Sequence, residues 1–268
     1  MGTGESIAQN QGNYKVVNGL NMYYEVHGTG SLLVLIHGGG STLYTTFGKI
    51  LPTLAKTHKV IGVELQAHGH TPDRNTPSSL EQDADDVAEL LKQLKVGPAD
   101  IFGFSNGGNT AMQLAIRHPA LIRKLIVASS FYQRSGMIDG FWEFMKKGTF
   151  EDMPQVYKDE YLKINPSQEG LIAMYNRDAA RMLNIKDWTD QDLQSIRAPS
   201  LIVIGDQDVV KHQHAVEMAR HIPVSRLAIL PGGHGSYMGE IMSAGSASKV
   251  PDLFIEMIRD YLAEPMVK

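Results

Sequence analysis

A serine surrounded by glycines, at residue 105, constrains the fold of this chain more than any other feature. The apolar run at residues 101–104 stops at Ser105, with Gly103 before it and Gly107 and Gly108 after it, and apolar residues at helical spacing follow. Side chains on the flanking positions would collide with the neighbouring strand and helix, so glycine is needed there. The pattern predicts a buried strand, a tight turn that exposes the serine, and a helix.

The sequence Gly-x-Ser-x-Gly between a strand and a helix is the signature of a nucleophile elbow. A serine hydroxyl is a weak nucleophile, and it needs a base and a group that orients the base. After such a turn, the acid and then the histidine follow in chain order. Residues 201–210 predict a strand and a loop with Asp206 and Asp208, and the last strand pattern is followed by His234. Ser105, His234 and one of these aspartates are therefore candidate catalytic residues.

Acyl transfer also requires N–H groups that stabilise an oxyanion. We expect one from Asn106, which directly follows the serine at the start of a helix, where the helix dipole favours negative charge. The second is expected from the glycines that follow His37, with Gly39 preferred and Gly40 as the alternative. His37 is expected to support this loop through hydrogen bonds.

The rest of the pattern is typical of an α/β protein. Residues 15–26 predict a β-hairpin, because an Asn-Gly pair lies between two β-prone runs. Residues 78–96 predict an amphipathic helix that begins with a capping box of Ser78 and Glu81. Short apolar strands alternate with helices elsewhere, which indicates a parallel sheet covered on both faces.

Residues 132–190 interrupt this alternation, because they contain helix-like patterns and no convincing buried strand. We expect a helical insertion that forms a lid over Ser105, rich in aromatic and methionine side chains that suit an apolar pocket. The candidate substrate-binding residues are Phe131, Met137, Phe141, Trp142, Phe144 and Met145. The alternative is that these side chains form only the core of a helical subdomain.

Composition excludes several classes of function. A formal charge of −4 and a pI near 6.2 give no electrostatic basis for binding nucleic acid or an anionic membrane. The absence of cysteine excludes disulfides and thiolate chemistry, and it fits a cytoplasmic protein. The first fifteen residues lack the features of a secretory signal, and no apolar run approaches the ~20 residues of a membrane span. Gly2 and Ser6 match a myristoylation pattern, which we interpret as a chance match.

The remaining histidines do not indicate a metal. His68 and His70 form one His-x-His pair, and His212 and His214 form another, but neither pair is accompanied by further ligands at suitable spacing. We expect these side chains to be solvated or to anchor loops. Glu64, at the end of a predicted strand, is expected to accept structural hydrogen bonds.

At this point the chain resembles the α/β-hydrolase superfamily, over residues 14–263. The motifs that carry the resemblance are HGGG at 37–40, GFSNGG at 103–108, GDQD at 205–208 and GGHG at 232–235. Within the superfamily the chain is similar to small bacterial esterases, haloperoxidase-like enzymes and carbon–carbon-bond hydrolases with a helical cap. The resemblance implies an α/β-hydrolase fold, with a mostly parallel eight-stranded sheet formed by residues 1–131 and 191–268 and a cap at 132–190.

The resemblance also implies roles for individual residues. Ser105 corresponds to the nucleophile, His234 to the base and Asp208 to the orienting acid, because the family acid usually lies three residues after the glycine that ends the strand. Two positions depart from the family pattern. Residues 64–71 read ELQAHGHT where many relatives have Asp-x-x-Gly-x-Gly-x-Ser, and His212 stands where many have proline. Both departures weaken any transfer of a relative's substrate.

These features predict a serine hydrolase that cleaves a carboxylic ester of a small, largely apolar molecule, without cofactor or metal. The same triad could instead cleave a C–C bond, a lactone or an amide, or form a peracid. An aspartate-nucleophile enzyme is disfavoured because the turn carries Ser105. A hypothesis of another class is a ligand receptor of the same fold with very slow turnover. A monomer or a homodimer is compatible with the sequence.

Overall fold

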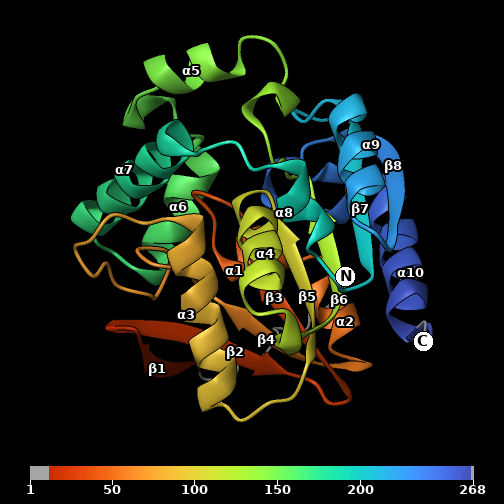
Figure 1. Cartoon of the computed structure of the whole chain (residues 1–268). Coiled ribbons are helices and arrows are strands. Elements are labelled where there is room, and N and C mark those ends of the chain that lie inside the picture. Colours follow the sequence, from red (N-terminus) through yellow and green to blue (C-terminus); the bar gives the residue numbers. More distant parts are fainter. Residues whose placement is uncertain (1–11, 267–268) are drawn as a thin grey trace, which may run out of the picture.

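The structure, a computed structural model, describes residues 12–266, and these contain an eight-stranded sheet (Figure 1). Its strands are β1 (Asn13–Val17), β2 (Leu20–His27), β3 (Ser31–Ile36), β4 (His58–Val63), β5 (Ala99–Phe104), β6 (Ile122–Ala128), β7 (Ser200–Gln207) and β8 (Ser225–Gly233). They lie in the order β1-β2-β4-β3-β5-β6-β7-β8, and only the pairs β1–β2 and β2–β4 are antiparallel. The predicted fold, with a mostly parallel eight-stranded sheet, is confirmed.

Helices cover both faces of this sheet. The helices of the described residues are α1 (Leu43–Phe47), α2 (Leu51–Leu54), α3 (Leu80–Gln93), α4 (Asn106–Arg117), α5 (Phe141–Lys147), α6 (Gln155–Ile164), α7 (Gln168–Asn184), α8 (Asp190–Gln194), α9 (His212–His221) and α10 (Val250–Ala263). One apolar core joins the strands to α3, α4, α8 and α9, and a second joins them to α1, α2 and α10. Burial of strands on both faces explains their near-continuous apolar sequences.

The predicted hairpin is β1–β2. Its two-residue turn consists of Asn18, with φ 47°, and Gly19, with φ 81°, and Val17 pairs with Leu20 across it. Positive φ at both turn positions suits an Asn-Gly pair and matches the twist of the strands.

The start of α3 differs from the prediction by one residue. The N-cap is Ser79, whose backbone is extended and whose Oγ accepts a hydrogen bond of 3.1 Å from the Gln82 N–H. Ser78 instead donates from Oγ to the carbonyl oxygen of Arg177 in α7, at 3.4 Å. The predicted pair of Ser78 and Glu81 was wrong because a tertiary contact, rather than the helix end, uses the first of the two serines.

Residues 132–190 contain the helices α5, α6 and α7 and the 3-10 turns Arg134–Gly136 and Phe150–Asp152. Figure 1 shows α5, α6 and α7 grouped together, apart from α9 and α10. The one β contact in this segment among the described residues is an isolated bridge between Met137 and Val210.

Among the described residues, no helix is long and apolar enough to cross a membrane. The myristoylation pattern at Gly2 and Ser6 lies outside them.

Candidate active site

Ser105 lies at the turn between β5 and α4 and has an unusual backbone, with φ 53° and ψ −122°. The turn is possible only because its neighbours lack side chains. A Cβ on Gly103 would lie 2.1 Å from the Gly107 carbonyl oxygen, and a Cβ on Gly107 would lie 2.1 Å from the carbonyl oxygen of Ile36. The chain therefore reverses tightly between its neighbouring elements, with the serine at the apex.

The structure brings Ser105 together with His234 and Asp208. His234 Nε2 lies 3.1 Å from Ser105 Oγ, and His234 Nδ1 lies 2.8 Å from Asp208 Oδ1. A carboxylate can only accept, so Nδ1–H donates to Asp208 and Nε2 is left to accept the serine proton. Three residues from three different loops thus form one continuous hydrogen-bonded chain, with the geometry that nucleophilic catalysis by a serine requires.

Asp208 is buried and fully engaged. Besides His234, it accepts from Ser129 Oγ at 2.5 Å, from the Gly205 N–H at 3.2 Å and from the Val210 N–H at 3.3 Å. Burial by itself would raise the pKa of this carboxyl, but the hydrogen bonds from His234 and Ser129 outweigh it and lower the pKa. Asp208 is therefore held as a carboxylate.

Asp206, the rival candidate for the acid, has a different role. Its Oδ1 accepts from the Gly232 N–H at 2.7 Å, which connects the end of β7 to the end of β8. Its side chain contacts neither Ser105 nor His234 in the described hydrogen bonds. Asp206 fixes the spacing of the two loops that carry Asp208 and His234.

The glycine loop after β3 meets the start of α4. A Cβ on Gly39 would lie 2.3 Å from Asn106 Nδ2, so the loop passes directly over the residue that follows Ser105. The Gly40 N–H donates to the carboxylate of Asp178 in α7. Within residues 12–266, no protein acceptor is recorded for the N–H of Gly39 or of Asn106. Both N–H groups are therefore free to bind a further group beside Ser105, whereas the Gly40 N–H is already used by Asp178.

A cavity of about 360 Å³ opens over Ser105. Its lining combines Gly39, Gly40, Ser105 and Asn106 with residues of the 132–190 segment: Phe144, Met145, Gly148, Thr149, Asp152, Met153, Pro154, Tyr157, Tyr175, Asp178, Ala179 and Met182. Of the six predicted substrate-binding residues, Phe144 and Met145 line this cavity.

The other four candidates pack elsewhere, which corrects the prediction. Phe131 and Met137 are buried in the main core, each 4% exposed. The rings of Phe131 and Phe141 both contact Trp142, at centroid distances of 5.9 and 5.0 Å. Trp142 also donates from Nε1 to the Arg134 carbonyl oxygen at 2.8 Å. These side chains attach α5 to the sheet and do not reach the cavity.

A contact that the sequence analysis missed joins α6 to the loop after His234. Tyr157, which lines the cavity, donates from its hydroxyl to Glu240 Oε1 at 2.6 Å. Glu240 is buried, and this burial raises the pKa of its carboxyl despite the bond from Tyr157. The loop that carries His234 is thereby attached to the 132–190 segment.

The His37 ring holds the glycine loop in place through two hydrogen bonds. Its Nδ1 donates to the Gly38 carbonyl oxygen at 2.7 Å, and its Nε2 accepts from the Leu65 N–H at 3.0 Å. Complete burial lowers the pKa of His37 to about 3, so the ring is neutral and can donate and accept as described.

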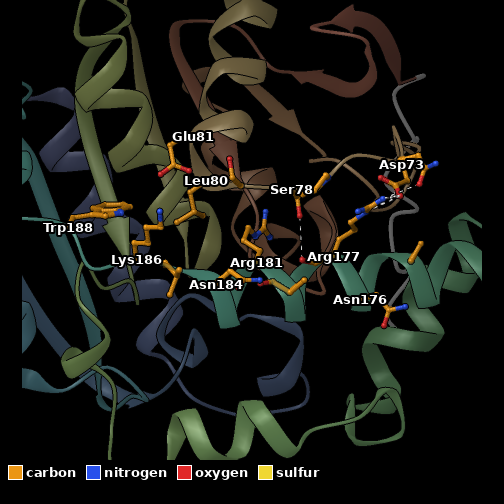
Figure 2. A pocket seen from close by; sticks show the side chains of 16 residues that line it. Asp73, Ser78, Leu80, Glu81, Asn176, Arg177, Arg181, Asn184, Lys186 and Trp188 are labelled. Atoms are coloured by element: carbon orange, nitrogen blue, oxygen red, sulfur yellow. Dashed lines mark hydrogen bonds and ion pairs between the residues drawn. The ribbon is translucent and has the colours of Figure 1, made fainter.

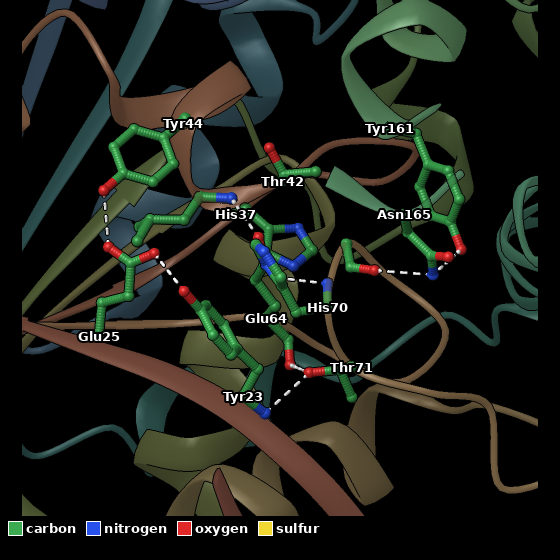
Figure 3. Close-up of polar contacts among 12 residues, drawn as sticks. Tyr23, Glu25, His37, Thr42, Tyr44, Glu64, His70, Thr71, Tyr161 and Asn165 are labelled. Carbon is green, nitrogen blue, oxygen red and sulfur yellow. Dashed lines mark hydrogen bonds and ion pairs between the residues drawn. The ribbon is translucent and has the colours of Figure 1, made fainter. Parts of the chain in front are cut away.

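Residues 64–71, which depart from the family pattern, are fixed by Glu64 (Figure 3). Buried Glu64 accepts from both the His70 N–H, at 2.7 Å, and the His70 ring Nδ1, at 2.9 Å. Asn165, at the end of α6, donates to the Gly69 carbonyl oxygen at 3.2 Å. The loop is thus attached both to the sheet and to the 132–190 segment.

The two His-x-His pairs have separate partners. His68 faces Asp178 at 2.8 Å and His70 faces Glu64, so the first pair points to two different acids. His214 Nε2 accepts from the Tyr132 N–H at 3.2 Å. Within residues 12–266, no group of three or more histidine or acidic side chains is arranged to hold a metal ion.

A second and larger cavity, of about 970 Å³, lies on the other side of α7 (Figure 2). It is bounded by the start of α3 and by α7 residues such as Arg177, which forms an ion pair of 2.8 Å with Asp73. Ser105 does not line it. Helix α7 therefore separates this cavity from the one that contains the serine.

The model of the α/β hydrolase fold family matches residues 31–171, just over half of the chain. The chain belongs to the α/β-hydrolase family.

This α/β hydrolase is 30% identical over 219 residues to the pimeloyl-[acyl-carrier protein] methyl ester esterase of Neisseria meningitidis serogroup C, covering 73% of this chain and 83% of that protein. It is 28% identical over 232 residues to the serine hydrolase BPHL of Homo sapiens, covering 81% and 77% of the two chains. The solved enol-lactonase from Burkholderia xenovorans LB400 superposes with a TM-score of 0.73 at 21% identity, covering 94% of this chain and 100% of that one. The likeness to the lactonase shows a shared fold.

Proposed function

We propose that this α/β hydrolase is a serine hydrolase that cleaves a carboxylic ester of a small, neutral and largely apolar molecule. One observation carries the proposal. The chain of hydrogen bonds from Ser105 through His234 to Asp208 begins in a mostly apolar cavity, directly beside two N–H groups that are left to hold an oxyanion.

In the acylation step, Ser105 Oγ attacks the ester carbonyl carbon while His234 Nε2 accepts the hydroxyl proton. The negative charge that develops on the carbonyl oxygen is held by the N–H groups of Asn106 and Gly39. Asp208 keeps the proton on Nδ1 and stabilises the imidazolium. His234 then returns its proton to the leaving alcohol, and the acyl group stays on the serine.

In the deacylation step, a water molecule takes the place of the alcohol. His234 accepts a proton from this water as it attacks the acyl carbon, and the same two N–H groups hold the second oxyanion. Return of the proton to Ser105 Oγ releases the acid and restores the starting state.

The cavity supports a neutral substrate. Its lining includes the carboxylates of Asp152 and Asp178 but no lysine, arginine or histidine. A substrate with its own carboxylate would find no cationic side chain in this lining to pair with. This disfavours the C–C bond hydrolase alternative for substrates that carry a carboxylate. One relative, 30% identical, is named a methyl ester esterase, which supports an ester as the substrate.

We further propose that residues 132–190 act as a cap, with 1–131 and 191–268 as the core. Most of the cavity lining outside the catalytic loops comes from this segment, including Phe144, Met145 and Tyr157. The cap would then determine which acyl or alcohol groups fit over Ser105.

The test is a panel of p-nitrophenyl esters from acetate to octanoate, with simple lactones and a carboxylate-bearing ester added, assayed with the wild type and with Ser105→Ala. We expect many turnovers on neutral esters, weak activity on the anionic ester and none with the variant. A single burst of product followed by no turnover would favour the receptor hypothesis. Equal activity of Ser105→Ala would refute the role of the serine.

A further inference from the structure

One cap residue reaches the loop that supplies the oxyanion hole. Asp178 lies in α7, and its carboxylate accepts the Gly40 N–H, 138 positions away in sequence. A Cβ placed on Gly39 would lie 3.1 Å from Asp178 Oδ2, so the carboxylate also packs against the residue whose N–H is left for the oxyanion. Asp178 is therefore in direct contact with both glycines.

Both oxygens of the Asp178 carboxylate accept hydrogen bonds. Oδ2 accepts from the Gly40 N–H and from His68 Nε2, the latter at 2.8 Å, and Oδ1 accepts from Arg181, which also pairs with Asp83. The residue is buried. Every polar neighbour of this carboxylate is a donor, so its position is set from three directions.

The hydrogen bonds of His68 define its charge. Its Nδ1 lies 2.9 Å from the Gln66 carbonyl oxygen, and its Nε2 faces the carboxylate of Asp178. Both partners can only accept, so both ring nitrogens carry protons and the ring is an imidazolium. Asp178 therefore lies between two cations, His68 and Arg181.

This charge balance resolves an apparent conflict. A lone carboxylate beside an oxyanion would oppose the negative charge that develops there, since like charges at short range in a buried site repel strongly. With a cation on each side, Asp178 can offer a strong, directional acceptor to the Gly40 N–H without leaving an unbalanced negative charge. The N–H of Gly40 is turned toward the cap, and that of Gly39 stays unused beside Asn106.

We infer that Asp178 is a positioning residue for the oxyanion hole. Through the Gly40 N–H it fixes the Gly39–Gly40 peptide, and this restrains the backbone at Gly39, so that the Gly39 N–H, which belongs to the preceding peptide, stays directed at the substrate. The orientation of that N–H therefore depends on the position of α7. The inference rests on the proposed function, because it assigns Asp178 to the oxyanion hole of that same site.

The test is Asp178→Asn, with Glu169→Gln as the matched control that removes one exposed charge from the same helix. No orientation of an asparagine amide satisfies three donors, because its NH₂ group must face either Arg181 or the pair of Gly40 and His68. We expect kcat on a p-nitrophenyl ester to fall about 10- to 100-fold, with KM changed by less than about 3-fold. The control should match the wild type in both constants.

A second measurement separates positioning from a purely structural role. A fluorophosphonate reacts with the nucleophilic serine and places its phosphoryl oxygen in the oxyanion hole, so its labelling rate reports on that hole without any turnover. We expect the rate for folded Asp178→Asn to fall by about the same factor as kcat. A loss of thermal stability with an unchanged labelling rate would overturn the inference.

His68→Gln provides a variant that does not alter the acid itself. Its amide N–H can still donate to Asp178, but the positive charge is lost, so we expect slower labelling here too. Labelling of both variants at the wild-type rate would overturn the inference, even if Asp178→Asn folds poorly. A wild type that is labelled but hydrolyses no ester would refute the proposed function alone. A wild type that is not labelled would refute both.

Discussion

Ser105 and Ser129 directly follow the neighbouring parallel strands β5 and β6, and both have a positive φ, of 53° and 51°. Neither is a glycine, so each conformation is strained by about 1–3 kcal/mol. Both residues are hydrogen bonded within the candidate site, Ser105 to His234 and Ser129 to Asp208. Backbone strain is thus present at the carboxyl ends of both β5 and β6, within the candidate site.

Replacement of Ser105 should separate activity from stability. We expect both Ser105→Ala and Ser105→Gly to lose about 10⁴-fold or more in kcat, because the triad acts as a unit. Glycine tolerates positive φ, so Ser105→Gly should be more stable than Ser105→Ala by about 1 kcal/mol. Ester kinetics and chemical denaturation measure the two effects. An alanine variant as stable as the glycine variant would contradict the strain at this position.

Ser129→Ala should lower kcat about 10-fold, since Asp208 loses its shortest hydrogen bond and its hold on His234 becomes looser. The matched control is Tyr237→Phe, because the Tyr237 hydroxyl lies 2.8 Å from Ser129 Oγ but makes no recorded bond to Asp208. The control should keep kcat within about 3-fold of the wild type. If both variants lose activity equally, the effect comes from packing around the two hydroxyls and not from Asp208.

Replacement of Asp208 should lower kcat far more than replacement of Asp206, the other aspartate of this region. Asp208→Asn should lower kcat about 10³- to 10⁴-fold, because an amide facing His234 disturbs the tautomer that accepts the serine proton. Asp206→Asn should change kcat by less than about 5-fold, since its amide oxygen can still accept the Gly232 N–H. Steady-state kinetics of both variants decide the assignment. Greater sensitivity at Asp206 would mean that the acid is misassigned.

Two aromatic residues of α5 provide a test of the cap. Phe144 is 62% exposed and lines the cavity, so Phe144→Ala should shift the ratio of kcat/KM between acetate and octanoate esters with little change in melting temperature. Trp142 packs on Phe131 and Phe141, so Trp142→Ala should cost about 1–3 kcal/mol of stability and leave the ratio unchanged. If Trp142→Ala changed the ester ratio and Phe144→Ala did not, Phe144 would not be a residue that determines substrate preference.

Stability should depend on pH through His70. Its hydrogen bond to Glu64 raises the pKa of the ring, and the ring also stacks on Tyr23 at 4.1 Å, which favours the cation. Because the folded pKa is raised, this stabilisation is complete below the unfolded pKa of about 6.5 and is lost as the pH rises through the folded pKa. Denaturation at pH 6 and pH 8.5 should therefore show a larger loss for His70→Asn at the lower pH. An equal loss at both values would mean that the contact is independent of charge.

The sequence could predict the surroundings of Ser105 because the constraints there are local. A tight turn between strand and helix requires glycines at fixed offsets, and polar residues directly after parallel strands gather at one edge of the sheet. Ser129, which directly follows β6, could have been found by the same argument. The family resemblance already favoured Asp208 over Asp206, but the physical reason needed the fold, since Asp206 accepts the Gly232 N–H while Asp208 contacts His234.

The cap could not be resolved in the same way. Trp142 and Phe144 are two residues apart on one short helix, and such positions point to nearly opposite sides, so one packs on the core and the other faces the cavity. Abundance of aromatic residues does not distinguish these sides. Asp178 and Arg181 have the spacing of an ordinary ion pair on a helix surface, and nothing local indicates that the acid reaches Gly40.

The two attachments of the 132–190 segment, Tyr157 to Glu240 and Asp178 to Gly40, limit how freely that segment can be exchanged between family members. A chimaera that carried a foreign segment would leave Glu240 and His68 buried without their partners and would release the Gly40 N–H. An exchange of the 132–190 segment therefore has to keep both partners of each contact, one in the segment and one in the rest of the chain. Diversification is expected to proceed at residues such as Phe144, which face the cavity and are joined to neither attachment.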